Sequence, residues 1–123
     1  MAALNDLVFD GGLNVIDAST ENLYLLSADP GLTWANVASY NLGVKANPAI
    51  ASPSDRSGGG REVVVTAITD GSVTATGTAT HFALTDDSGT DILVSGAISA
   101  SQVVTTGNVF TLTEFSIGIP DPA

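Results

Sequence analysis

Short runs of strand-forming residues separated by turn residues fill the second half of this 123-residue chain. Val, Thr, Ala, Ile and Phe dominate the runs over 62–119, and Gly, Asn and Asp stand between them. Regular short strands with such turns are typical of antiparallel sheets. The pattern therefore predicts a mainly β fold over 62–119, as an antiparallel β-sandwich or a barrel-like domain.

A hairpin is predicted at the start of this region. Residues 62–69 (EVVVTAIT) form a β-branched run, and residues 72–78 (SVTATGT) alternate beyond it. Asp70-Gly71 between them is a typical tight-turn pair. Further strands are expected over 80–86 and 91–98.

The last predicted strand, 109–119, contains a change of phase. Phe110 and Leu112 share one face, whereas a regular strand would place three later apolar residues on the other: Phe115, Ile117 and Ile119. One inserted residue reverses the facing of a strand. A β-bulge near Thr113–Glu114 would therefore place all five side chains on one side.

The first half of the chain is predicted to begin with a helix over 3–17, capped by Asn5 or Asp6. Its helical period places five apolar residues on one face, which we expect to be the inward face: Leu4, Leu7, Val8, Val15 and Ile16. The Gly11-Gly12 pair would either allow close packing or divide the helix. Residues 22–28 favour a strand. Residues 32–44 show no clear period, and Trp34 and Tyr40 are expected to anchor them over the core.

All positive charges of the chain fall within 45–61, at Lys45, Arg56 and Arg61. This segment is also the richest in Pro, Ser and Gly, which predicts an extended arm or long loop. Five acids precede it and seven follow it. We therefore expect an anionic partner to bind here. Arg56 and Arg61 would bind carboxylates of a neighbouring chain or pair loosely with the chain's own acids.

Composition limits the classes of function. A chain of this length supports one domain, 1–123, and only 13% of its residues are charged, against roughly 25% in an average globular protein. So low a charged fraction suggests that other subunits cover much of the surface, or that the surface faces the outside of an assembly. A net charge of −10 repels nucleic acid and anionic lipid, so neither nucleic acid nor membrane is expected as a partner.

The chain contains no cysteine, so disulfides and thiolate chemistry are excluded. Its first residues lack the basic stretch of a secretory signal, and no apolar run reaches the ~18 residues of a membrane helix. We therefore expect synthesis in a cytoplasm.

No residue pattern predicts an enzyme or a cofactor. His81 is the only histidine, no second histidine or cysteine would complete a metal site, and no G-x-S-x-G motif is present. The Gly58–Gly60 run precedes Arg61 and a strand, whereas a phosphate loop needs Lys and Ser or Thr at the start of a helix. A flexible hinge is the favoured interpretation.

An acidic turn is the one candidate for a cation. Asp86, Asp87 and Asp91 surround a Ser-Gly pair, and clustered carboxylates attract Ca²⁺. Their spacing lacks the alternating acids of an EF-hand loop, so an ordinary turn is favoured and no metal site is predicted. Together with Tyr24, Trp34 and Tyr40 the turn also allows a glycan-binding hypothesis.

Four segments taken together carry a resemblance to a known group: NDLVFDGGLNVID, SDRSGGGREVVV, the stretch from ITDGSV to TLTEF, and IGIPDP. They resemble small virion structural proteins of tailed bacteriophages and prophages, especially alphaproteobacterial ones. The resemblance covers nearly the whole chain and transfers no functional residue. It implies a virion component, either a capsid decoration (cement) protein or a tail-associated protein.

The resemblance and the composition favour a non-enzymatic decoration protein that binds and stabilises the shell of major capsid protein. The alternatives are a tail, connector or fibre protein, a glycan-binding module, and an enzyme using His81. Location in the virion is implied, and a homo-oligomer, with a trimer favoured, is expected. The predicted partner-binding residues are Lys45, Arg56, Arg61, Trp34 and Tyr40.

Overall fold

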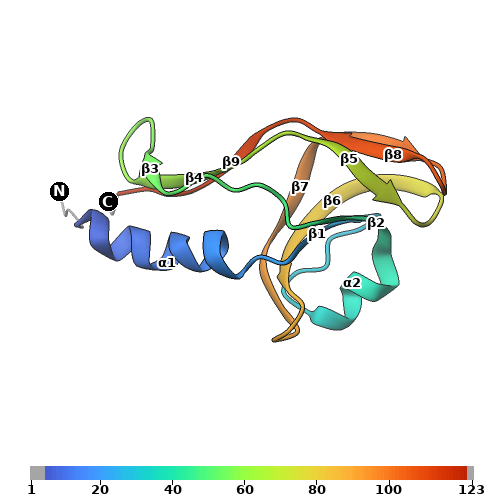
Figure 1. The fold of residues 1–123 in the computed structure, drawn as a ribbon, viewed down its shortest axis with the longest axis horizontal. Helices are drawn as coiled ribbons and strands as arrows, with labels where there is room; N and C mark the ends of the chain where they lie inside the picture. Colours follow the sequence, from blue (N-terminus) through green and yellow to red (C-terminus); the bar gives the residue numbers. More distant parts are fainter. Residues whose placement is uncertain (1–4, 122–123) are drawn as a thin grey trace.

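Two antiparallel sheets and two helices make up the computed structural model, which describes residues 5–121 (Figure 1). Strands hold 50% of these residues and helices 18%, which confirms the predicted mainly β class with an N-terminal helix. In chain order the elements are α1 (Asp6–Ser19), β1 (Asn22–Leu26), α2 (Trp34–Tyr40), β2 (Asn41–Ala46), β3 (Ser54–Asp55), β4 (Arg61–Val65), β5 (Ile68–Val73), β6 (Gly77–Asp86), β7 (Asp91–Val104), β8 (Val109–Leu112) and β9 (Phe115–Ile119).

The larger sheet has six strands in the order β7-β6-β1-β2-β5-β8, and it curves into a half-barrel. The curvature brings its two edge strands near one another, and the Gln102 side chain of β7 donates a hydrogen bond to the Thr111 carbonyl of β8 at 2.7 Å. The main core lies inside this curve, and its largest fully buried side chains include Leu23, Leu25, Leu84 and Phe110.

The smaller sheet, β3-β4-β9, continues from the larger one. The pairing of β4 with β9 passes into the pairing of β5 with β8, so residues 61–73 and 109–119 form one long two-stranded ribbon. The ribbon changes sheets at 66–67 and 113–114. The irregularity predicted near Thr113–Glu114 is therefore present, as a break between two strands instead of a bulge within one. Phe115 and Ile117 beyond it pack against the main core.

The predicted hairpin around Asp70-Gly71 is wrong. β5 continues through both residues, with a register shift between Ile68 and Gly71, and it pairs with β2 and β8 instead of with residues 72–78. The reason for a glycine at position 71 is steric, because a Cβ there would lie only 2.3 Å from the ring of Phe110. The glycine thus marks a close approach of β5 to an aromatic ring.

The N-terminal helix is confirmed over most of its predicted length, but the predicted inward face is wrong. Asn5 caps it, because its side chain accepts a hydrogen bond from the backbone N–H of Leu7 at 2.9 Å. Phe9 and Leu13 are buried, whereas three residues of the predicted inward face are 79%, 60% and 49% exposed, namely Leu7, Val8 and Val15. Leu4 lies outside the described residues. Ile16, the remaining member, packs at the edge of the main core.

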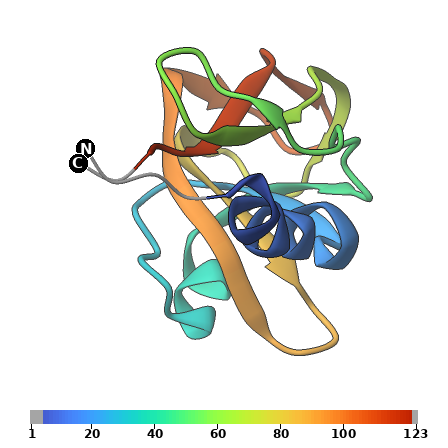
Figure 2. The same cartoon turned by 90° about the vertical axis from the view of Figure 1, so that its left-hand side faces the viewer.

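Figures 1 and 2 show why only a narrow face of α1 is covered: the helix runs along one side of the β3-β4-β9 sheet. A three-stranded sheet contacts one row of helix side chains and leaves the flanks open. The helix continues through Gly11 and Gly12 without a break. No helix among residues 5–121 has the length and apolarity required to cross a membrane.

The segment 45–61 lies along the body. Its ends are in strands, with Lys45 in β2 and Arg61 in β4. Between them the backbone N–H of Ala51 donates to Val64, and that of Thr66 donates to Ala49, each at 2.9 Å. The turn around Gly58–Gly60 projects beside β3, and all three glycines there have positive φ (Figure 1).

Candidate functional site

Arg61 joins three elements at one end of the molecule. Its guanidinium donates to both Asp10 carboxylate oxygens of α1, at 3.0 and 3.2 Å, and to Asp55 of β3 at 2.7 Å. These hydrogen bonds raise the pKa of Arg61 above its ordinary value. Of the two roles considered for this residue, the structure shows the intramolecular one: Arg61 fastens α1 and β3 to β4.

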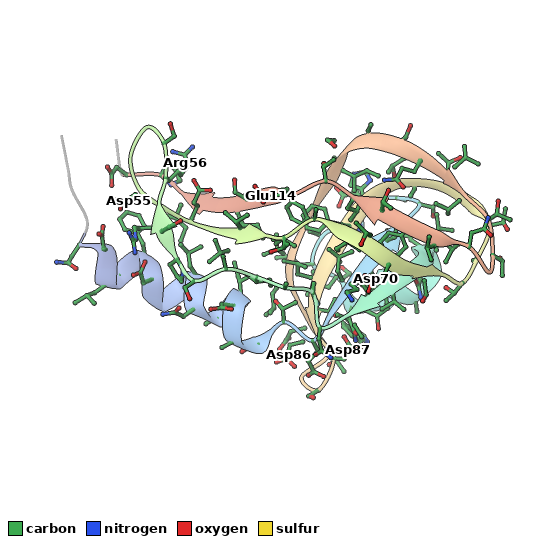
Figure 3. The ribbon with its side chains drawn as sticks, turned by 45° about the horizontal axis from the view of Figure 1, so that its top comes forward. Asp55, Arg56, Asp70, Asp86, Asp87 and Glu114 are labelled. Atoms are coloured by element: carbon green, nitrogen blue, oxygen red, sulfur yellow. The ribbon has the colours of Figure 1, made fainter. Side chains whose placement is uncertain are left out.

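The other two cations differ in their partners. Lys45 pairs with Asp70 at 3.1 Å across β2 and β5. Arg56 donates to the carbonyl of Gly59 in its own turn at 3.0 Å, and it forms no ion pair with any residue of 5–121. Figure 3 shows Arg56 at the projecting turn. Within the described part of the chain, Arg56 is thus the cation that remains available to a partner.

The predicted aromatic partner-binding residues, Trp34 and Tyr40, lie at the two ends of α2. Both are half-buried and pack on a second apolar cluster made by Leu26, Val37, Ala83 and Ile92. Tyr24 packs on the same cluster. Much of each ring therefore contributes to the protein's own core.

The acidic turn between β6 and β7 is held by hydrogen bonds to β1 (Figure 3). Asp87 accepts from the Asn22 amide at 2.8 Å, from the Tyr24 hydroxyl at 2.7 Å, and from the hydroxyl of the fully buried Thr85. Burial and this bond to Asp87 raise the pKa of Tyr24 to about 12.

Two further acids accept hydrogen bonds at this turn. Asp86 accepts from the Gly89 N–H at 3.2 Å, and Glu21 accepts from the Ser88 N–H at 3.0 Å. Hydrogen bonding from the side chain and the backbone of Ser88 lowers the pKa of Glu21. Among the residues that the structure describes, no group of three His, Cys, Asp or Glu side chains is arranged to hold a metal ion. Of the weak cation candidates, Asp86 and Asp87 accept hydrogen bonds from this region, and Asp91 lies opposite Asp86 at the start of β7.

His81 lies half-buried on β6, beside Leu26 of β1 and Ala97 of β7 in the sheet. Its Nδ1 is 2.8 Å from the hydroxyl of the neighbouring Thr80. Among residues 5–121, no carboxylate forms a hydrogen bond with this ring. The geometry required of a Ser–His–Asp triad is absent from this described region.

Two exposed features remain beyond the individual residues that the sequence singled out. The first is the outer face of α1, which we define as Leu7, Val8 and Val15. Gly11 lies between them, where an added Cβ would meet nothing within 4 Å. The signal was present as helical periodicity, but the period does not show which face of a helix a sheet will cover.

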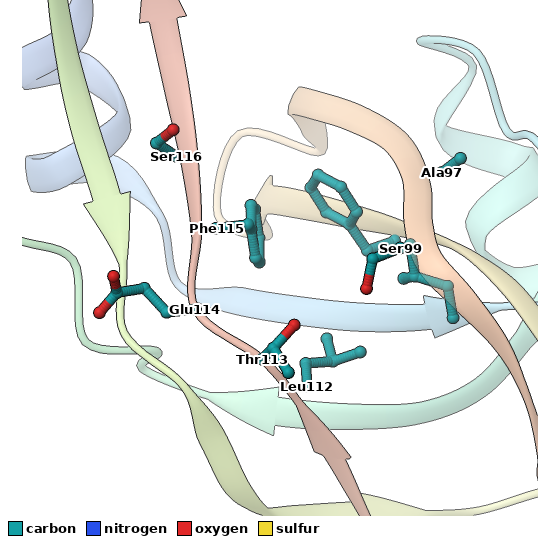
Figure 4. A pocket seen from close by; sticks show the side chains of 9 residues that line it. Ala97, Ser99, Leu112, Thr113, Glu114, Phe115 and Ser116 are labelled. Carbon is teal, nitrogen blue, oxygen red and sulfur yellow. The ribbon is translucent and has the colours of Figure 1, made fainter. Parts of the chain in front are cut away.

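The second feature is a pocket of about 270 Å³ between the edge strand β7 and the junction of β8 and β9 (Figure 4). The phase change at Thr113–Glu114 was the only sequence signal near it. The rings of Phe82 and Phe115 meet there with centroids 4.6 Å apart. The pocket is lined by Phe82, Ala97, Ile98, Ser99, Leu112, Thr113, Glu114, Phe115 and Ser116.

Comparison with known proteins adds no assignment, because no family model, curated protein or solved structure matches the chain.

Proposed function

We propose that this chain is a non-enzymatic structural protein of a tailed-bacteriophage virion. In this proposal it is a capsid decoration protein that binds the outer surface of the major capsid protein shell and stabilises it. The observation that carries the proposal is the outer face of α1, which presents apolar side chains to solvent on a helix that is held firmly in place. The resemblance to small virion proteins is the reason for proposing a virion as the assembly that this face binds.

The energetics favour a covered surface. Full burial of one Leu or Val side chain contributes roughly 1.5–3 kcal/mol. Three such side chains on one face therefore offer several kcal/mol to a partner. Because Arg61, Phe9 and Leu13 already hold α1 in position, little ordering cost opposes binding.

Charge favours the capsid protein, rather than a second copy, as the partner at this face. Two copies with a net charge of −10 repel each other. Arg56 adds the one described cation without an ion pair, at the turn near the same end of the molecule (Figure 3). No observation in the described residues favours glycan binding or catalysis, because the three aromatic rings pack on the core and His81 bonds to Thr80.

The test is the composition of virions whose genome encodes this chain. Heads and tails are separated on a gradient, the chain is quantified in each by mass spectrometry, and its density is located by cryo-EM. We expect it on the outside of heads in a fixed ratio to the major capsid protein. Its presence in tails alone would replace this proposal with the tail-associated alternative.

Variants then test the α1 face. The triple variant Leu7→Gln, Val8→Gln and Val15→Gln keeps side chains that helices tolerate well, and we expect it to fold normally while head occupancy falls about tenfold or more. Leu32→Gln is the matched control, because Leu32 is 72% exposed but precedes α2. Full occupancy by the triple variant would contradict the proposal.

A further inference from the structure

The two edges of the half-barrel leave an open seam. Within residues 5–121, β7 pairs only with β6, β8 only with β5, and β9 only with β4. At one end of the seam the Gln102 side chain spans from β7 to the carbonyl of Thr111. Beyond that bridge the strands separate and the 270 Å³ pocket lies between them (Figure 4).

Both walls of the seam carry interrupted ladders. On β7 the register passes from Ala97, opposite His81, to Gln102, opposite Ala79, so residues 98–101 have no ladder partner on β6. On the other wall, Thr113 and Glu114 lie between the β5–β8 and β4–β9 ladders and belong to neither. Backbone N–H and C=O groups require partners, and here two interrupted segments face one pocket.

The β7 edge also lacks charge and proline, two of the devices that usually protect a free strand. Charged residues, prolines and shortness normally prevent edge-to-edge pairing. β7 is 14 residues long, and from Ile92 to Val104 it has neither charge nor proline. β8 and β9 are likewise uncharged. The one charge in this region is Glu114, which is exposed and forms no ion pair among the described residues.

The shape of the pocket limits its occupant. Sites for small molecules and cofactors usually hold about 300–1,000 Å³, so this pocket of about 270 Å³ is near the lower end of that range, and it opens between strand edges. Its apolar lining comes mainly from Phe82, Ile98, Leu112 and Phe115. These dimensions suit one apolar side chain projecting from an extended backbone.

We propose that the seam between β7 and the β8–β9 junction binds an extended, cationic segment of another protein by strand addition. The segment's backbone pairs with the free edge of β7, and one of its apolar side chains enters the pocket. A neighbouring Lys or Arg of the segment forms an ion pair with Glu114. The inference concerns peptide binding as such and does not depend on the virion assignment.

Charge argues against a second copy of this chain as the occupant. Lys45 and Arg61 are engaged in internal ion pairs. Arg56 lies in a tight turn and bonds to it, whereas strand addition needs an extended segment. The remainder of the chain is acidic, so a cationic partner chain gains attraction where a second copy meets repulsion.

The test uses the full chain, labelled with ¹⁵N, and three soluble heptapeptides. The first has the sequence Thr-Val-Lys-Leu-Lys-Val-Thr, the second replaces both lysines with glutamates, and the third is the lysine peptide N-methylated at alternate amides. We expect the lysine peptide to shift the amide resonances of residues 97–101 and 113–116, and to bind about tenfold tighter than either other peptide.

Three variants assign the contacts. Glu114→Gln should reduce the preference for lysine over glutamate to about threefold or less, whereas Asp17→Asn, which removes the same charge from α1, should leave the preference unchanged. Ala97→Trp, at an exposed lining position, should fill the pocket and abolish binding while the spectrum remains folded.

Several results would overturn the proposal. These are no binding of the lysine peptide at about 1 mM, equal binding of the N-methylated peptide, or shifts confined to α1. Concentration-dependent shifts at the seam without any peptide would assign it to a second copy instead. None of these measurements involves virions. A negative result here therefore does not contradict the decoration proposal, and a negative result for the decoration proposal does not contradict peptide binding at the seam.

Discussion

Asp87 links two strands that are far apart in the sequence. Its carboxylate accepts hydrogen bonds from Asn22 and Tyr24 of β1 and from Thr85 of β6. A phenol that is buried and donates to a carboxylate is stabilised in its neutral form. The same contact therefore holds the acidic turn in place and raises the pKa of Tyr24.

Alkaline stability tests this contact. Tyrosine in the unfolded chain has its ordinary pKa of 10.0, whereas the pKa of Tyr24 in the folded protein is raised to about 12. The unfolded state therefore loses this proton first, so the contribution of Tyr24 to stability is complete below pH 10 and is lost as the pH rises toward 12.

We expect Tyr24→Phe to lower the free energy of unfolding at pH 7 by about 1–2 kcal/mol, since one hydrogen bond to a charged acceptor is lost. We also expect its stability to fall less steeply than that of the wild type between pH 10 and 12. Urea unfolding followed by circular dichroism across this range measures both effects. Parallel stability curves for the two proteins would contradict the raised pKa.

At the scale of elements, α1 is held against the smaller sheet by two buried side chains and one arginine. Phe9 and Leu13 provide its buried contacts, and Arg61 binds Asp10 through two hydrogen bonds. Asp6 and Asp55 lie on the same guanidinium, at 3.8 and 2.7 Å. Three carboxylates around one cation would repel one another without it.

Charge reversal at the two arginines should therefore have different effects. Arg61→Glu adds a carboxylate beside Asp6, Asp10 and Asp55, so we expect amide hydrogen exchange in α1 to accelerate about tenfold or more while β1 and β6 keep their protection. Arg56→Glu is the control, because Arg56 forms no ion pair among residues 5–121. Equal exchange rates in the two variants would show that Arg61 does not fasten the helix.

At the scale of the whole molecule, the ribbon made by residues 61–73 and 109–119 unites the two sheets. The larger sheet encloses the main core, and the smaller sheet supports α1 (Figure 1). The places where the ribbon changes sheets are also where its ladders stop. The seam is therefore open because the same two-stranded ribbon contributes strands to both sheets, and its backbone pairing is interrupted where it passes from one sheet to the other.

Net charge makes a prediction at this scale. The chain carries 13 acids and 3 bases, and such an excess destabilises a compact state through self-repulsion. Screening acts over about 10 Å at 0.1 M salt. We therefore expect Tm to rise by about 3–6 °C between low and physiological salt, as a gain of about 1 kcal/mol would produce. Calorimetry in sodium chloride measures this, and a Tm that falls with salt would mean that the internal ion pairs outweigh the repulsion.

The sequence by itself determined features that depend on neighbouring residues. Alternation located strands over 80–86 and 91–98, Asn5 marked the start of α1, and the change of phase located the break at Thr113–Glu114. The composition also showed that cations are scarce. These patterns are local because backbone dihedral preferences, helix capping and side-chain alternation act over only a few residues.

Only the tertiary structure decided which surfaces meet. It showed that Gly71 lies beneath Phe110 instead of in a turn, that Arg61 binds Asp10, and that Leu7 faces solvent while Phe9 faces the sheet. The sequence of the short helix α2 shows no clear period. The seam between β7 and the β8–β9 junction is formed by residues from separate strands. These features escaped prediction because each depends on a contact between residues distant in the chain, which local sequence patterns do not encode.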